Sequence, residues 1–588
     1  MTAAVQTLWA QLLATTLADA GVTRCVISPG SRSTPLVAAL AGEPRLDLVT
    51  LIDERAAAFF ALGAARAGAP PVALVCTSGT AAAHYLPAII EASLAGVPLL
   101  AITADRPPEL QDCGASQTID QVKLYGGFVR GAFDLGAPSD GPLALRAVRR
   151  KVVQAITLAL GPHPGPVHLE VPLRKPLEPA APSSDAEHAL ARAAAQLAGA
   201  VAIAPPRLAP DPEAIRALAA AIAREPRGAI IAGALPVGFA AARDALHDLA
   251  QRAGYPILAE AGSQLRFAPR RATPPVHAMI DHFDLIPTAE LPDTRLVIQL
   301  GAEPVAAAWP AWSARLAAAG AERWVLAGPT WRDPDAAAHG VIVGDVALTV
   351  HAVARELAAM ATGAERAFAA EWRAEDRAAD LVRPALEAHP RSEPAVLRAA
   401  IAAVPERCAI QIGNSLPIRV IDQVCGSGGP ARPVLTQRGA AGIDGLIASA
   451  AGATWSGRPV LLVLGDVSFA HDLGGLLAAR AAKSPLAILV IDNAGGQIFA
   501  GLPFGGGDAG PAFERHWTTP PGVDPVAVAT ALGLRATRAE SPAAVAAAIA
   551  AALDAPGATV VHAPVPPSGA RDVRRTVLET FAQRKPKP

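Results

Sequence analysis

Short runs of apolar residues recur along the chain and alternate with longer, alanine-rich stretches of helical character. Short apolar runs bounded by turn residues are typical of buried strands, and their alternation with helices predicts parallel sheets. The runs occupy residues 23–28, 46–52, 72–76, 99–103 and 167–171, then 229–232, 256–259 and 296–300, and finally 408–412, 433–436, 460–464, 486–491 and 559–563. We therefore predict an α/β protein with three doubly wound parallel-sheet domains in series.

The segments between these groups of strands suggest the domain boundaries. Residues 176–212 are rich in alanine and proline around one polar helix, which is typical of a linker, and charged helices precede the third group. The predicted organisation is an N-terminal domain at 1–180, a linker at 181–212, a central α/β domain at 213–355, a helical linker at 356–391 and a C-terminal domain at 392–588.

Composition argues against several classes of protein. The chain has 51 Lys and Arg against 52 Asp and Glu, and these charges are scattered, so we expect no nucleic acid partner. No apolar run is long enough to span a bilayer, and the N-terminus lacks the basic start of a signal peptide. The five cysteines show no close pair, and Cys25, Cys76 and Cys408 lie in predicted strands. These features favour a cytoplasmic enzyme with core thiols.

Asp466 and Asn493 form the most informative pair of residues. Asp466 follows the apolar run 459–464, and Asn493 follows the next run, 485–491, after a helix-like segment. In a parallel sheet both residues emerge at the carboxyl edge, where α/β folds bind ligands. A carboxylate, an amide oxygen and the backbone carbonyls that follow Asn493 are hard oxygen ligands. They suit a Mg²⁺ that keeps its remaining positions for phosphate and water.

Three loops of the first domain have the features of anion sites. Residues 28–35, 77–80 and 103–108 each follow a strand, and the first two combine Gly with Ser or Thr ahead of a helix. Arg32 and Arg106 add guanidinium groups that suit carboxylates. Helix capping alone explains any one such loop. The argument for anion binding therefore depends on their occurring together at strand ends.

Glu54 directly follows an apolar strand and precedes a helix that we expect at residues 55–67. An acid at a helix N-terminus is ordinarily explained by the helix dipole. By itself, this position therefore does not distinguish a structural role from a catalytic one.

Together, these stretches resemble the 2-succinyl-5-enolpyruvyl-6-hydroxy-3-cyclohexene-1-carboxylate (SEPHCHC) synthase family, thiamine diphosphate-dependent enzymes of menaquinone biosynthesis. The resemblance covers essentially the whole chain. It is strongest at residues 28–35, 53–63, 77–80, 103–108, 114–117, 413–419, 438–445, 465–472 and 493–503. Thiamine enzymes in general share the Glu and the Gly-Asp to Asn spacing, whereas the loops at 28–35 and 103–108 and the stretches at 413–419 and 438–445 look specific to this branch.

The resemblance implies a thiamine diphosphate-binding fold with an N-terminal domain of the pyrimidine-binding type and a C-terminal domain that binds diphosphate and Mg²⁺. It implies a transferase that decarboxylates 2-oxoglutarate and adds the resulting succinyl carbanion equivalent to isochorismate by conjugate addition. The implied cofactors are thiamine diphosphate and Mg²⁺, or Mn²⁺ in its place. A homodimer or homotetramer with sites between subunits also follows from the resemblance.

The same resemblance assigns roles to individual residues. Glu54 is the catalytic residue, because in this family such a Glu contacts the aminopyrimidine ring and promotes removal of the thiazolium C2 proton. The implied cofactor contacts are Glu54, Thr80, Gly413, Ser415, Ile443, Gly465, Asp466, Ser468, Asn493, Gly495 and Ile498; the implied substrate contacts are Ser31, Arg32, Arg106, Gln117, Arg419, Arg438, Phe499 and Leu502; and the implied metal ligands are Asp466, Asn493 and Gly495.

The four arginines suit these substrates, since both carry two carboxylates that planar guanidinium groups can bind in bidentate fashion. We expect Arg419 and Arg438 to hold 2-oxoglutarate, and Arg32 and Arg106 to hold isochorismate.

Several residues depart from the family pattern, and three alternatives stay open. Ser116 and Gln437 stand where Asn is usual, and Ala306-Ala307 stand where many relatives have a Lys, which bears on substrate affinity. The first alternative is another thiamine diphosphate-dependent carboligase or decarboxylase, such as an acetolactate synthase type. The second is an NAD-binding oxidoreductase, against which the lack of a G-x-G-x-x-G after a strand counts. The third is a non-catalytic relative that senses metabolites.

Overall fold

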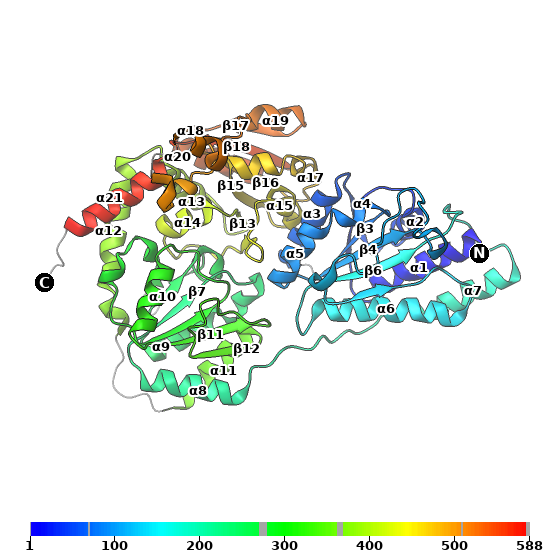
Figure 1. Cartoon of the computed structure of the whole chain (residues 1–588), viewed down its shortest axis with the longest axis horizontal. Helices are drawn as coiled ribbons and strands as arrows, with labels where there is room; N and C mark the ends of the chain where they lie inside the picture. The colour runs from blue at the N-terminus through cyan, green and yellow to red at the C-terminus, as the bar shows by residue number, and fades with distance from the viewer. Residues whose placement is uncertain (1, 69–70, 270–278, 361–367, 507–509, 584–588) are drawn as a thin grey trace. The chain divides into compact units, whose positions relative to one another are not determined.

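The computed structural model describes residues 2–68, 71–269, 279–360, 368–506 and 510–583. These residues form three six-stranded parallel sheets in succession along the chain (Figure 1). Every strand range predicted from the sequence overlaps an observed strand. The prediction of three doubly wound α/β domains is therefore confirmed.

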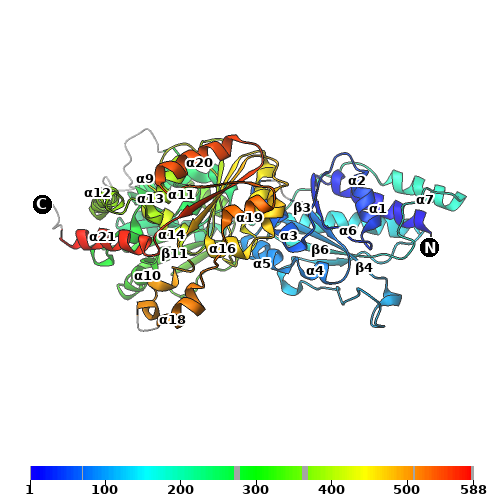
Figure 2. The ribbon, with the colours of Figure 1, turned by 90° about the horizontal axis from the view of Figure 1, so that it is seen from above.

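The N-terminal sheet has the strand order β2-β1-β3-β4-β6-β5. Its strands are β1 (Arg24–Ile27), β2 (Asp47–Thr50), β3 (Val72–Cys76), β4 (Leu99–Asp105), β5 (Ala132–Asp134) and β6 (Pro166–Pro172). One face packs against α1 (Ala3–Asp19), α2 (Thr34–Ala41) and α6 (Pro142–Leu160), and α3 (Glu54–Arg66) and α5 (Leu86–Ala95) lie side by side on the other (Figures 1 and 2). The strand order reverses between β1 and β3, which makes this point the topological switch of the sheet.

The central sheet has the order β12-β11-β10-β7-β8-β9. Its strands are β7 (Gly228–Ala232), β8 (Ile257–Ala259), β9 (Met279–Ile280), β10 (Leu296–Leu300), β11 (Glu322–Gly328) and β12 (Gly340–Val343). The helices α8 (Pro212–Arg224), α9 (Arg243–Ala253) and α11 (Val346–Ala359) share one apolar cluster with the sheet, and α10 (Trp309–Ala318) and α12 (Arg373–Ala388) belong to a second.

The C-terminal sheet, with the order β14-β13-β15-β16-β18-β17, repeats the topology of the first. Its strands are β13 (Ala409–Ile412), β14 (Val434–Thr436), β15 (Val460–Gly465), β16 (Leu486–Asp492), β17 (Arg535–Arg538) and β18 (Ala558–Pro564). One face packs against α13 (Glu393–Ala402), α14 (Leu416–Val424), α20 (Pro542–Asp554) and α21 (Gly569–Gln583). The switch point of this sheet lies between β13 and β15.

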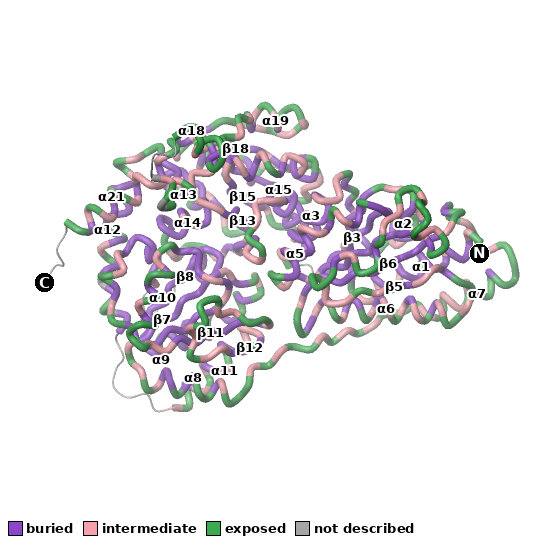
Figure 3. Tube along the Cα trace, viewed as in Figure 1, coloured by how far each residue is buried: buried purple, intermediate pink, exposed green. Residues whose placement is uncertain are grey.

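The remaining α-helices, apart from α7, are short. They are α4 (Thr80–Ala83), α7 (Asp185–Gln196), α15 (Leu446–Ala453), α16 (Asp466–His471), α17 (Gly475–Ala479), α18 (Gly510–Phe513) and α19 (Pro525–Ala531). The sheet strands are mostly buried, whereas α7, in the predicted linker, is largely exposed (Figure 3). In the part of the chain that the structure describes, no helix is long and apolar enough to cross a membrane. Cys25, Cys76 and Cys408 are buried free thiols, as predicted.

The chain forms two compact units that do not follow chain order strictly. One comprises Met1–Arg207, Gly439–Gly457 and Asp472–Lys483, and the other comprises the rest. The first unit therefore takes in α15 and α17. Two glycines permit this packing, because a Cβ on Gly63 of α3 would lie 1.8 Å from the Ser449 carbonyl oxygen, and one on Gly452 of α15 would lie 1.8 Å from the Phe60 carbonyl oxygen. The backbones of α3 and α15 thus touch directly.

Asp472 is a buried acid that holds the start of α15 within this unit. Its Oδ2 accepts hydrogen bonds from Ile447 N (2.7 Å) and Ala448 N (3.2 Å), and its Oδ1 has no partner in the described chain. Burial raises the pKa of Asp472 to about 7, although the two N–H groups and Arg55 lower it in part. Keeping this carboxyl inside the fold is therefore costly once it is ionised.

We expect Asp472→Asn to stabilise the protein at about pH 8 but not at about pH 4, because the amide oxygen can accept the same two hydrogen bonds without a buried charge. The folded pKa of about 7 lies above the ordinary value of 3.8, so the folded state holds a proton that the unfolded state lacks between these pH values. Wild-type stability should therefore fall as pH rises from about 4 to about 7 and then level off. Thermal unfolding across this range tests the idea, and a difference in Tm that does not vary with pH would contradict it.

Candidate functional site

In the N-terminal unit, the loops that follow β1 and β3 flank the switch point and interlock. The backbone N–H of Arg32 donates to Thr77 Oγ1 (3.2 Å). A Cβ on Gly30 would lie 2.3 Å from Thr77 Cβ, so only glycine allows the two loops to approach this closely. The loop after β4 joins them, because Arg106 Nη1 donates to Ser78 Oγ. The three loops that the sequence singled out therefore form one surface at the carboxyl edge of the sheet.

Arg32 and Arg106 make this surface cationic. Arg32 is only 5% exposed, its Nη1 donates to the Leu173 carbonyl (2.7 Å), and its Nε has no partner among the residues described. Burial lowers the pKa of Arg32, and the like charge of Arg106 adds to the effect, whereas Asp105 opposes it. Two adjacent cations with a spare buried donor are suited to an anionic ligand.

Glu54 lies at the same edge, as the first residue of α3, four residues after the end of β2. Its neighbour Asp53 is the N-cap of the helix, and Asp53 Oδ1 accepts from the N–H groups of Arg55 (2.9 Å) and Ala56 (3.3 Å). Because Asp53 already caps the helix, the half-buried Glu54 carboxylate is not needed for that purpose. The remaining sequence-predicted residues of this edge, Ser31, Thr80 and Gln117, are exposed, and Gln117 Nε2 donates to the Ser78 carbonyl (3.0 Å).

A buried polar network, which the sequence did not suggest, connects these loops to the strands beneath them. Gln121 Oε1 accepts from Gly79 N (2.8 Å), and Gln121 Nε2 donates to Glu170 Oε1 (3.1 Å). Glu170 in turn accepts from the Thr103 hydroxyl. Burial, together with the charge of Glu170, raises the pKa of Asp105 to about 7. The network ties β4 and β6 to the loop after β3 and so orients its N–H groups.

In the second unit, Asp466 and Asn493 follow the neighbouring parallel strands β15 and β16 and so lie at the same carboxyl edge, as the sequence predicts. Gly495 N donates to Asp466 Oδ2 (2.6 Å). Gly495 has φ +108°, and a Cβ there would lie 2.2 Å from the Thr518 carbonyl oxygen, so this turn requires glycine. Burial raises the pKa of Asp466 to about 6, with a further contribution from the charge of Asp492.

The donor set at this place fits a divalent cation. Asn493 Oδ1 is buried and has no hydrogen-bond partner within the described residues, while its Nδ2 donates to Glu393 Oε2 (3.0 Å). A buried amide oxygen without a partner is costly unless a ligand satisfies it. A group of three His, Cys, Asp or Glu side chains that could hold a metal is absent from the described residues, so any ion here would need the amide and backbone oxygens.

Arg419 lies in the first turn of α14, after β13, and Arg438 lies in the loop that follows β14. Arg419 Nη1 donates to the Ser415 carbonyl (2.7 Å), and Ser415, at φ +72°, is the N-cap of α14. Arg438 Nη1 donates to Asn414 Oδ1 (3.1 Å). Both guanidinium groups are therefore anchored at the carboxyl end of β13 and β14.

The other predicted residues lie near the ends of strands and helices in the two units. Gly465 and Ser468 flank Asp466, and Ile498 is half-buried after Gly495. Phe499 and Leu502, predicted as apolar walls, are 37% and 42% exposed. Ile443 is half-buried and belongs to the N-terminal unit, through its segment Gly439–Gly457.

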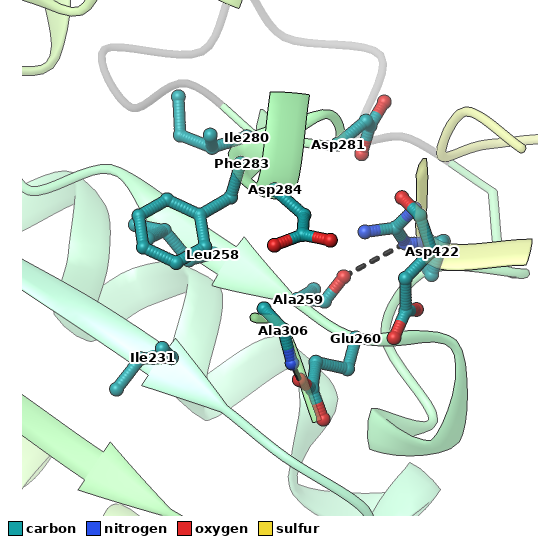
Figure 4. A pocket seen from close by; sticks show the side chains of 11 residues that line it. Ile231, Leu258, Ala259, Glu260, Ile280, Asp281, Phe283, Asp284, Ala306 and Asp422 are labelled. Atoms are coloured by element: carbon teal, nitrogen blue, oxygen red, sulfur yellow. Dashed lines mark hydrogen bonds between the residues drawn. The ribbon is translucent and has the colours of Figure 1, made fainter. Parts of the chain in front are cut away.

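A separate small cavity lies at the carboxyl edge of the central sheet and contains none of the predicted site residues (Figure 4). Glu260, Asp284 and Asp422 line it, and a backbone N–H group donates to each: Val305 N to Glu260 Oε1 (2.5 Å), Ala308 N to Asp284 Oδ1 (2.8 Å) and Ala261 N to Asp422 Oδ1 (2.5 Å). Ala306, which departs from the family pattern, lines this cavity. The cavity is thus a structural polar network, and the candidate site lies elsewhere.

Two protein family models match the regions that contain the carboxyl edges of the N-terminal and C-terminal sheets. Residues 9–124 match the model for the N-terminal TPP binding domain of thiamine pyrophosphate enzymes, and residues 425–563 match the model for the C-terminal TPP binding domain. Glu54 lies in the first matched region, and Asp466 and Asn493 lie in the second. Thiamine diphosphate binding is therefore a property of the families that match this chain.

Two curated relatives match nearly the whole chain. A 2-succinyl-5-enolpyruvyl-6-hydroxy-3-cyclohexene-1-carboxylate synthase from Sorangium cellulosum is 42% identical and covers 96% of this chain and 94% of its own length. One of the same name from Halobacterium salinarum is 39% identical over 88% of each chain. Among solved structures, benzoylformate decarboxylase from Polynucleobacter necessarius has a TM-score of 0.71 at 18% identity, covering 96% of this chain and 98% of its own, which shows a shared fold.

Proposed function

The chain belongs to the SEPHCHC synthase family, and from this premise we propose that it uses thiamine diphosphate and Mg²⁺ to join 2-oxoglutarate to isochorismate with loss of CO₂. The observation that carries the proposal is that Asp466, Gly495 and the orphaned oxygen of Asn493 follow the neighbouring strands β15 and β16 at one carboxyl edge, where Gly495 N donates to Asp466. Mn²⁺ should also be accepted, since it takes the same oxygen ligands as Mg²⁺.

In this proposal the second unit holds the diphosphate end of the cofactor. Asp466, the amide oxygen of Asn493 and the Gly495 carbonyl would bind the cation, and the loops at Gly413 and Ser415 would lie beside the cofactor. When bound, thiamine diphosphate supplies the electron sink that accepts the electron pair left by decarboxylation. The protein itself contributes position, charge and exclusion of water.

Glu54 has the role of a proton-holding group. Its carboxylate would accept the hydrogen bond of the protonated pyrimidine ring nitrogen and so favour the tautomer that removes the C2 proton. Asp53 already caps α3, which leaves the Glu54 carboxylate available for this contact. The family places such a Glu against the diphosphate site of another subunit, so a homodimer or homotetramer belongs to the proposal.

The test is an assay of the purified chain with 2-oxoglutarate, isochorismate, thiamine diphosphate and Mg²⁺, following both the loss of isochorismate and the release of CO₂. We expect one CO₂ to be released for each isochorismate consumed. The alternative carboligase activity is tested by replacing 2-oxoglutarate with pyruvate. Turnover of pyruvate in preference to 2-oxoglutarate, or CO₂ release without loss of isochorismate, would contradict the proposed substrate pair.

The arginine pairs should differ in the substrate that they affect. Arg→Lys keeps the charge but loses the planar fork, so each change should raise a KM by about 10-fold. We expect the Arg419 and Arg438 variants to have a raised KM for 2-oxoglutarate. The Arg32 and Arg106 variants should have a raised KM for isochorismate. Steady-state kinetics with both substrates varied test this division. The control is Arg295→Lys, because Arg295 is exposed and pairs with Asp293. Equal increases of both KM values in all four variants would exclude this division.

A further inference from the structure

Glu393 is a buried acid whose position in the sequence suggests no role. It is the first residue of α13 and is only 1% exposed. A Glu in the first turn of a helix is ordinarily solvent-exposed and serves the helix dipole. Here Ser392 already caps the helix, because its side chain accepts from Ala395 N. The burial of Glu393 therefore needs another reason than the start of α13.

The contact of Glu393 with Asn493 supplies this reason. Asn493 Nδ2 donates to Glu393 Oε2 (3.0 Å), across 100 residues of sequence. The side chain of asparagine has a donor end and an acceptor end, which are related by a rotation of half a turn. A carboxylate oxygen on one side attracts the NH₂ group and repels the carbonyl oxygen. The contact with Glu393 thus determines which end of the amide faces the other way.

The other end of the amide, Oδ1, is left without a protein donor among the described residues. Asn493 Oδ1 is buried without a hydrogen-bond partner in the part of the chain that the structure describes. Gly495, two residues after Asn493, donates to Asp466 Oδ2 (2.6 Å), which places the Asp466 carboxylate beside the same loop. If the amide were reversed, it would present an NH₂ group to the cation, and NH₂ is not a ligand for Mg²⁺.

We propose that Glu393 is a positioning residue that holds the amide of Asn493 so that its oxygen faces the divalent cation beside Asp466. This inference rests on the proposed function, since it presupposes the cation. Groups that orient metal ligands by a second hydrogen bond typically change metal affinity by about 10- to 100-fold when they are removed.

The test measures binding of Mn²⁺ to the full-length protein in the presence of thiamine diphosphate, by the electron paramagnetic resonance signal of free Mn²⁺. Glu393→Leu removes the acceptor at similar volume. Glu393→Asp keeps the carboxylate but withdraws it by about 1.5 Å, one carbon–carbon bond, which breaks the 3.0 Å contact. We expect both variants to bind Mn²⁺ at least about 10-fold more weakly than wild type. Excess metal should restore much of their kcat.

The matched control is Glu375→Leu. Glu375 is a buried acid of α12 whose two oxygens accept from Asp281 N and His282 N (both 3.1 Å), away from the Asp466 site. Its loss should lower the Tm, as a structural role predicts, and leave the Mn²⁺ affinity unchanged. A shared fall in Mn²⁺ affinity in the Glu375 and Glu393 variants would indicate a general loss of stability and overturn the inference.

Two further results would contradict the role of Glu393. Wild-type Mn²⁺ affinity in folded Glu393→Leu or Glu393→Asp protein would overturn it, and the Asp variant decides alone if the Leu variant does not fold. Failure of the wild-type protein itself to bind Mn²⁺ with thiamine diphosphate would overturn the proposed cofactor site, and with it the role of Glu393. The two failures are therefore distinguishable.

Discussion

Asp466→Ala is expected to abolish synthase activity and to weaken thiamine diphosphate binding, with only partial recovery in excess Mg²⁺. Asp466 is the one carboxylate in the proposed ligand set, and its removal also takes away the acceptor for Gly495 N (2.6 Å). The cation would then be held by neutral oxygens alone, while the turn at Gly495 loses an anchor. Calorimetric titration with thiamine diphosphate at low and high Mg²⁺ measures the effect, which we expect to exceed about 100-fold at low Mg²⁺.

Asp524→Ala is the control for this experiment. Asp524 is an exposed carboxylate in the same unit, where it caps α19 through the N–H groups of Val526 and Ala527. Loss of such a cap costs about 1 kcal/mol of stability and should leave cofactor binding unchanged. Near-normal cofactor affinity in Asp466→Ala would count decisively against the metal site.

Glu54→Gln is expected to bind thiamine diphosphate almost normally and to lose about 10²-fold or more of its rate. Glutamine keeps the shape of the side chain, but it cannot stabilise the positive charge of a protonated pyrimidine nitrogen. The decisive measurement is the exchange rate of the C2 proton of the bound cofactor, because it isolates activation from the later steps. Unchanged exchange in the variant would exclude this role for Glu54.

Glu43→Gln provides a comparison within the same unit. Glu43 precedes β2 at the opposite, amino edge of the sheet, where it pairs with Arg45 (2.7 Å). Loss of this pair should leave both the exchange rate and turnover unchanged. A rate loss shared by the two variants would indicate an effect on the fold of the N-terminal unit and not on the reaction.

Sequence patterns predicted the strands well where the strands are buried and apolar. They missed β5, β9, β11, β12 and β17. β9 has two residues, and β5 and β17 are edge strands with mostly exposed or half-buried side chains, so none shows a clear apolar run. β11 is an interior strand but begins with Glu322 and Arg323, and the buried Arg323 pairs with Asp333. A buried charge is tolerable when a distant partner neutralises it, and local sequence does not reveal such a partner.

The sequence by itself determined the chemistry at the strand ends. Asp466 and Asn493 follow consecutive strands, and the loops of Arg32 and Arg106 follow β1 and β4, so a parallel sheet alone brings each set to one edge. Tertiary structure decided what orients these groups. Glu393 reaches Asn493 across 100 residues, and Gln121 reaches Gly79 across 42. Such contacts depend on which helix packs on which strand, and a buried Glu or Gln has no local pattern that distinguishes it from a solvated one.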